Sequence, residues 1–69
     1  MTALEMLEEL ALGGYKACWY ARRIEGQPVP HVRVTCQHGL LYHVNDLPAT
    51  REQAQALLEE NMIASPGGH

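Results

Sequence analysis

The sequence predicts an α+β domain in which a three-stranded antiparallel meander carries two helices packed on one face. Apolar residues recur at helical spacing over residues 2–12 and again after Thr50, and three segments rich in strand-forming residues lie between these two regions. Consecutive strands joined by short turns form a meander, and two amphipathic helices cover one of its faces. We therefore expect a single domain over residues 1–64, in the order α-β-β-β-α, and a disordered tail over residues 65–69.

Size and composition narrow the possible functions. The chain has 69 residues, 46% of them hydrophobic, and a formal net charge of −3. A chain of this length buries only roughly 60% of its unfolded surface, which leaves little room for a second domain or a deep cofactor cleft. The first twelve residues lack a basic start, and no apolar run approaches the roughly 20 residues of a membrane span. We expect a cytoplasmic protein with no cofactor and no membrane partner.

Both expected helices begin with a capping box. Thr2 and Glu5, and later Thr50 and Gln53, have the spacing at which a hydroxyl and a longer polar side chain cap each other's backbone amides. Gly13-Gly14 ends the first helix, because glycine tolerates the left-handed conformation of a helix C-terminus. The expected core stripes are Leu4, Leu7, Leu10 and Ala11 in the first helix, and Ala54, Leu57, Leu58 and Met62 in the second, which Ile63 extends.

The first strand, expected over residues 15–25, has two faces that could each be buried. One face carries Ala17 and Trp19, and the other carries Lys16, Tyr20 and Arg22. A loop follows, because prolines at positions 28 and 30 remove amide donors. Trp19 is interpreted as a core anchor, or as an interface hot spot if it faces outward.

The second and third strands form a hairpin around a three-residue loop, Gln37-His38-Gly39. Gly39 supplies the left-handed residue that such loops use. A one-residue slip would turn one strand's side chains to the other face, so the hydrophobic pattern favours this loop length. Leu47-Pro48-Ala49 is expected to break the third strand before the second helix. The predicted cross-strand pairs are Cys36 with Leu40, Val34 with Tyr42, and Val32 with Val44.

Charge is distributed unevenly along the chain. Residues 1–14 hold three acids and no base, residues 15–43 hold four bases and one acid, and residues 44–69 hold four acids and one base. The segment charges are therefore −3, +3 and −3, so the helices are acidic and the sheet is basic. If both helices cover one sheet face, the other face presents bases interleaved with aromatic residues, a composition typical of protein-binding surfaces.

This pattern predicts a small non-enzymatic protein-binding module, an adaptor or an inhibitor of the kind that mobile elements encode. It would dock through its basic-aromatic sheet face, or through a sheet edge, onto an acidic protein surface. One alternative is a nucleic-acid-binding domain that uses the same face. Another is a homodimer whose sheet face or edge pairs with itself. The predicted partner-binding residues are Lys16, Trp19, Tyr20, Arg22, Arg33 and His43.

The expected order of elements is similar to the layout of double-stranded-RNA-binding domains. That family binds RNA through its first helix, the loop after its first strand and a basic start to its last helix. Here the first helix is acidic and the second begins Thr50-Arg51-Glu52-Gln53, with a single base. His31 after Pro30 resembles the family's loop histidine. The resemblance implies a shared architecture, and no RNA-contact residue is transferred.

Cysteine and histidine provide the only set of residues with metal-site chemistry. Cys18, Cys36, His38 and His43 lack the paired spacing of zinc sites, and Cys36 and His43 belong to opposite faces in the expected register. We therefore expect no metal, and two reduced, partly buried thiols. A Cys–His nucleophile needs an activated thiolate in a water-poor pocket, for which so thin a domain has little room. No catalytic residue is predicted.

Overall fold

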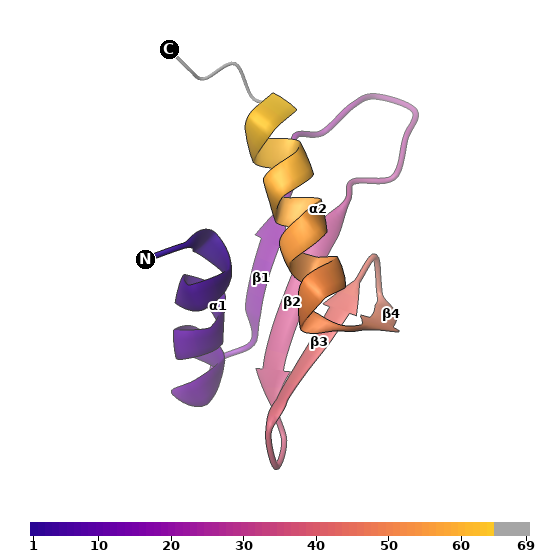
Figure 1. The fold of residues 1–69 in the computed structure, drawn as a ribbon. Coiled ribbons are helices and arrows are strands. Elements are labelled where there is room, and N and C mark those ends of the chain that lie inside the picture. Colours follow the sequence, from indigo (N-terminus) through magenta and orange to yellow (C-terminus); the bar gives the residue numbers. More distant parts are fainter. Residues whose placement is uncertain (65–69) are drawn as a thin grey trace.

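The computed structural model describes the backbone of residues 1–64 and the side chains of residues 1–61. Helix α1 (Ala3–Leu12) is followed by strands β1 (Ala17–Tyr20), β2 (His31–Cys36), β3 (Leu40–Val44) and β4 (Leu47–Ala49), and helix α2 (Arg51–Ala64) comes last (Figure 1). The strands form one antiparallel sheet in the order β1-β2-β3-β4. The tail predicted over residues 65–69 and the side chains of Met62 and Ile63, predicted as part of the core stripe, lie outside the described residues.

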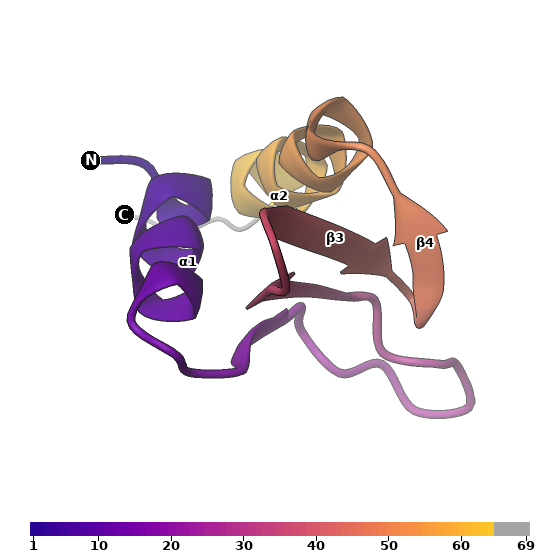
Figure 2. The same ribbon diagram turned by 90° about the horizontal axis from the view of Figure 1, so that it is seen from below.

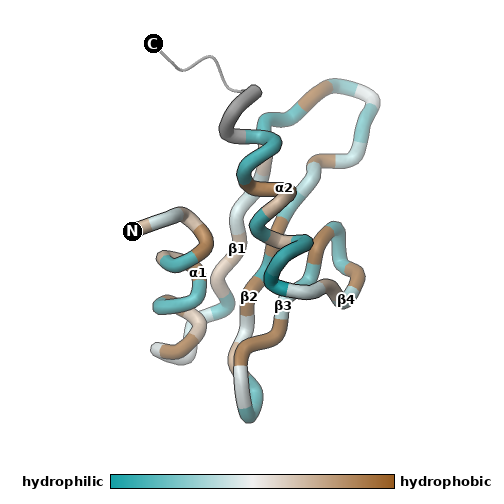
Figure 3. The backbone as a smooth tube through the Cα atoms, in the orientation of Figure 1, coloured by the Kyte–Doolittle hydropathy of each residue, from teal (hydrophilic) through white to brown (hydrophobic). Residues whose placement is uncertain are grey.

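Both helices lie on the same side of the sheet, which confirms the predicted α+β class (Figure 2). α1 contacts β1 and β2, and α2 contacts β2 and β3. The core between these two layers is small, and its side chains come from α1, the first two strands and α2. It consists of Leu4, Leu7, Ala11, Ala17, Val32, Val34, Ala54 and Leu58. The hydrophilic colour that dominates α2 in Figure 3 agrees with how few of its residues reach this layer.

The predicted capping boxes are both present. In α1, the Thr2 hydroxyl accepts the Glu5 amide at 3.1 Å, and the Glu5 carboxylate accepts the Thr2 amide at 2.8 Å. Thr50 and Gln53 make the same reciprocal pair at the start of α2, at 3.1 and 2.8 Å. The prediction of Leu10 as a core residue is wrong, since 48% of it is exposed. It lies about 100° around the helix from the buried Ala11, and so on the flank of α1.

β1 is shorter than predicted and ends at Tyr20 instead of extending to residue 25. The pairing with β2 sets Ala21 opposite Pro30, and the Ala21 amide donates to the Pro30 carbonyl at 2.8 Å. Proline has no amide to return the bond, and Pro28 would meet Arg23 at the next bonded position, so the ladder stops. The structure also resolves which face of this strand is buried: Ala17 is buried and Trp19 packs against the core.

The hairpin of β2 and β3 has the predicted register. Cys36 pairs with Leu40, Val34 with Tyr42 and Val32 with Val44. The loop turns on two consecutive residues with positive φ, His38 at 59° and Gly39 at 131°. Val32 and Val34 are fully buried, which fixes the register because a slip of one residue would expose both.

The third strand ends at Val44, before Leu47-Pro48-Ala49 as predicted, but this segment forms a fourth strand, so the predicted meander has one strand too few. Asn45 and Asp46 have φ values of 53° and 68°, and positive φ at both central residues is what a tight two-residue hairpin turn requires. Pro48 pairs with His43, between the two hydrogen-bonding positions of β4. Its ring nitrogen therefore faces away from β3, where the missing amide breaks no bond.

A carboxylate joins the two helices to the sheet. Glu8 on α1 accepts a hydrogen bond from the Tyr42 hydroxyl of β3, and its two oxygens accept from Arg51 of α2 at 2.7 and 3.2 Å. The Glu8 side chain is only 13% exposed. The hydrogen bond from Arg51, helped by that from Tyr42, outweighs burial and lowers the pKa of Glu8. The pKa of Tyr42 is raised, first by burial and then by its hydrogen bond to Glu8.

We expect Glu8→Gln to lower the free energy of unfolding by roughly 1–3 kcal/mol at neutral pH, because the neutral amide is a weaker acceptor for Arg51 and Tyr42. Because the pKa of Glu8 is lowered in the folded chain, its contribution is present above the ordinary value of 4.5 and is lost as pH falls through the folded value. Urea unfolding of both proteins at neutral and acidic pH measures the difference. Glu9→Gln, an exposed neighbour on the same helix, is the control, and equal losses in both variants would contradict the role of Glu8.

Candidate functional site

The sheet face opposite the helices, called the open face below, carries mostly polar and aromatic side chains. Strand alternation places every second side chain there. The register aligns Cys18, Arg33, His43 and Pro48 across all four strands, and it sets Tyr20 beside His31. The open face consists of Cys18, Tyr20, His31, Arg33, Thr35, Leu41, His43 and Pro48.

Three of the six predicted partner-binding residues lie on the open face: Tyr20, Arg33 and His43. Lys16 and Arg22 are exposed immediately before and shortly after β1. Trp19 lies on the other side of the sheet, where it packs against the core. Its role as a core anchor is therefore the one the structure supports, and the open face lacks the tryptophan hot spot that an outward orientation would have supplied.

A small ionic cluster links β2 to the turn between β3 and β4. The Nε2 atom of His31 lies 3.1 Å from the Asp46 carboxylate, and Arg33 Nη1 lies 3.4 Å from the same oxygen. The Nδ1 atom of His31 lies 3.0 Å from the Val29 carbonyl. Both ring nitrogens thus face acceptors, and only the protonated ring has two N–H donors to satisfy them. The Val29 carbonyl first, and Asp46 second, raise the pKa of His31, and the His31 bond lowers the pKa of Asp46.

Tyr20 stacks on the ring of His31. The ring centroids are 5.2 Å apart and the planes differ by 23°. Tyr20 nevertheless remains 62% exposed. Because His31 is held by Val29 and Asp46, the stack restrains one face of a large aromatic ring that is otherwise exposed.

His43 contributes an unsatisfied polar atom. Its Nδ1 is buried and has no hydrogen-bond partner among the described residues. His43 pairs with Arg33 across the strands, so this atom lies within the row that crosses the open face. A buried polar atom without a partner typically costs about 1–3 kcal/mol.

The positive charges are not shared evenly over the open face. Of the five Lys and Arg residues, Arg33 pairs with Asp46 and Arg51 pairs with Glu8. The other three form no ion pair within the described part of the chain, and all three flank β1. They are Lys16 before the strand and Arg22 and Arg23 after it, and all are exposed. The uncompensated basic surface therefore lies along β1, and not at the centre of the face where Arg33 was expected to supply it.

The expectation of partly buried thiols is wrong, because Cys18 and Cys36 are both exposed. Cys18 lies on the open face, and Cys36 lies at the end of β2, where the core no longer covers it. Within the described side chains, no three His, Cys, Asp or Glu residues are grouped so that they could hold a metal ion.

Sequence reasoning missed Asp46, and assigned no site role to His31 or Arg23. The Asn45-Asp46 pair carried a usable signal, since both residue types tolerate positive φ and so favour a tight turn. That turn, combined with the register of β2 and β3, would have placed Asp46 near the start of β2. The Asn45 side chain reinforces this placement by accepting the His31 amide at 3.0 Å.

No family model, curated protein or solved structure matches this chain. The similarity to double-stranded-RNA-binding domains is therefore one of element order alone, and the fourth strand departs even from that order. None of the helices in the described part of the chain has the length and hydrophobicity that a membrane crossing requires.

Asp46→Asn is expected to lower the pKa of His31 toward its ordinary value of 6.5, yet leave it raised, because the Val29 carbonyl remains. The substitution suits the turn, since asparagine also tolerates positive φ. The His31 contribution to stability is present below 6.5 and is lost as pH rises through the raised folded pKa, and that of Asp46 is lost as pH falls through a value below 3.8. The loss in the free energy of unfolding of Asp46→Asn should therefore be largest between pH 3.8 and 6.5, where both contributions are fully present in the wild type.

An NMR titration of the His31 ring, together with urea unfolding across this pH range, measures both effects. Glu52→Gln removes an acid at the start of α2 and is the control. An unchanged His31 pKa in Asp46→Asn would show that the carboxylate does not hold the ring.

Proposed function

We propose that this protein is a non-enzymatic binding module, an adaptor or inhibitor in the cytoplasm, that docks an acidic protein surface on the β1 side of its open face. The observation that carries the proposal is the position of the unpaired bases. Lys16, Arg22 and Arg23 all flank β1, and the exposed Tyr20 lies between them. Charges of this kind steer encounter, and an exposed tyrosine supplies buried area in the complex.

The open face offers binding more readily than catalysis. His31 is the group best suited to proton transfer, yet both of its ring nitrogens are already engaged by Val29 and Asp46. Arg33 is likewise directed to Asp46. A substrate would have to displace these contacts to reach either residue, whereas a protein partner can use Tyr20 and the three bases without disturbing them.

Nucleic-acid binding by the same surface is the second candidate, because the Tyr20–His31 stack could receive an unpaired base. The acidic helices and the Asp46 carboxylate oppose a polyanion, which makes a compact acidic protein the better match. Self-association is the third reading. Two copies would pair through the edge at β1 or through the open face.

Lys16→Gln combined with Arg22→Gln is expected to slow association with the partner by roughly tenfold and to leave folding intact. The matched control is Leu47→Glu with Ala56→Glu, which reaches the same net charge through exposed sites on β4, the opposite edge of the sheet, and on α2. A partner is first isolated from cells that express the chain, identified and purified. Its association rate with the three proteins is then measured at increasing salt.

Equal rates for the two double variants would contradict steering by the β1 bases. Gel-shift titration with single- and double-stranded oligonucleotides at low salt separates the second candidate, and we expect no shift under this permissive condition. A shift that disappears in Lys16→Gln, Arg22→Gln would replace the protein partner with a nucleic acid.

A further inference from the structure

β1 is a sheet edge whose backbone is available. The Ala21–Pro30 hydrogen bond and the register show that Ala17, Trp19 and Ala21 direct their backbone groups toward β2. The alternate residues, Cys18 and Tyr20, therefore direct their amides and carbonyls away from the sheet. An edge of this kind is a template for another strand.

The opposite edge is protected. β4 has three residues, and Pro48 turns its ring nitrogen, which has no hydrogen to donate, toward solvent. β1 contains no proline and no charged residue within Ala17–Tyr20. The two edges thus differ in the features that normally prevent strand addition.

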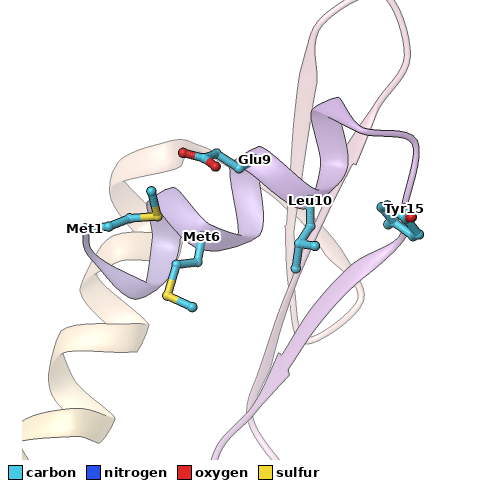
Figure 4. A pocket seen from close by; sticks show the side chains of 5 residues that line it. All are labelled: Met1, Met6, Glu9, Leu10 and Tyr15. Atoms are coloured by element: carbon cyan, nitrogen blue, oxygen red, sulfur yellow. The ribbon is translucent and has the colours of Figure 1, made fainter.

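An open apolar pocket of about 360 Å³ lies beside α1, lined by Met1, Met6, Glu9, Leu10 and Tyr15. Figure 4 shows Met6 and Leu10 projecting from the same side of the helix, and Tyr15 in the segment that leads into β1. Glu8, on the opposite flank of α1, reaches toward α2. Because α1 lies over β1 and β2 while α2 lies over β2 and β3, the flank with Met6 and Leu10 faces outward past β1.

Charge selects the occupant of this edge. Lys16 precedes β1, and Arg22 and Arg23 follow it, so an added strand meets positive charge at both ends. In an antiparallel pair of two β1 strands centred on Trp19, Lys16 of one copy would oppose Arg22 of the other. Such like-charge pairs are destabilising. Glu9 at the pocket disfavours an acid there, which leaves the pocket for an uncharged apolar side chain.

We propose that β1 receives an extended segment of another protein as a fifth strand, with acidic residues at the ends of that segment and an apolar side chain in the Met6–Leu10 pocket. The inference rests on the proposed function and specifies how the partner binds. Backbone bonds to Cys18 and Tyr20 supply affinity, and the pocket and the flanking bases supply specificity.

The test presents a display library of random peptides to the full chain. Enriched peptides are expected to carry acids flanking a strand-forming core, and to slow hydrogen exchange at the amides of Cys18 and Tyr20. Cys18→Pro removes one outward amide without removing a bond to β2, and should weaken binding of a selected peptide by roughly tenfold. Leu10→Ser tests the pocket, and Leu12→Ser, an exposed leucine outside it, is the control.

The outcomes separate the two proposals. Peptides that need Lys16 and Arg22 but leave the Cys18 and Tyr20 amides unprotected overturn strand addition and leave the proposed function standing. Peptides that protect these amides and ignore the loss of both bases overturn the acidic partner. If Cys18→Pro fails to fold, hydrogen exchange in the wild-type chain tests strand addition by itself: a selected peptide should slow exchange at the amides of Cys18 and Tyr20. Failure to enrich any peptide overturns the proposed fifth strand. A dimer that light scattering detects and that Cys18→Pro dissociates also overturns it, because β1 would then pair with a second copy of the chain.

Discussion

The Glu8 carboxylate is the contact on which the one-sided architecture depends. It accepts hydrogen bonds from Tyr42 on β3 and from Arg51 at the start of α2, partners 34 and 43 residues away along the chain. These bonds join both helices over the same sheet face, and the apolar side chains of both helices fill the single layer beneath them. A chain of this size has little apolar surface left for a second layer. The other face is consequently left to polar and aromatic residues, and this is where the candidate site lies.

The positions of the prolines explain why the two edges of the sheet differ. β4 owes its place to a tight turn and is closed to further pairing by its proline, whereas β1 ends early because prolines oppose its continuation. The chain thus uses proline in both places, to protect one edge and to shorten the other. The bases that flank β1 remain unpaired because neither acid that forms an ion pair in the described residues contacts them: Glu8 pairs with Arg51, and Asp46 pairs with His31 and Arg33.

Features set by neighbouring residues could be predicted from the sequence. The capping boxes at Thr2 and Thr50 and the β2–β3 register depend on contacts that are local or on a pattern that only one register satisfies. The length of β1 could not be predicted in this way, because it is set by prolines that lie opposite it in another segment. Leu10 has the spacing of a core residue, yet its burial depends on where the sheet edge falls beneath α1. The fourth strand was missed because Pro48 is a strand breaker except at an outward position, and that position is known only once the turn before it is placed.

The candidate site shows the same division at the level of charge. The summed charges of the three chain segments predict a basic sheet, and they do not distinguish Lys16, Arg22 and Arg33 as binding residues. Folding separates them, because the turn at residues 45–46 brings a carboxylate to Arg33 and to His31 but forms no ion pair with Lys16 or Arg22. Which bases remain available to a partner is therefore decided by a two-residue turn with no hydrophobic signature. For a small basic surface, the placement of a single acid determines which bases stay unpaired, and the charge pattern of the sequence predicts only that such a surface exists.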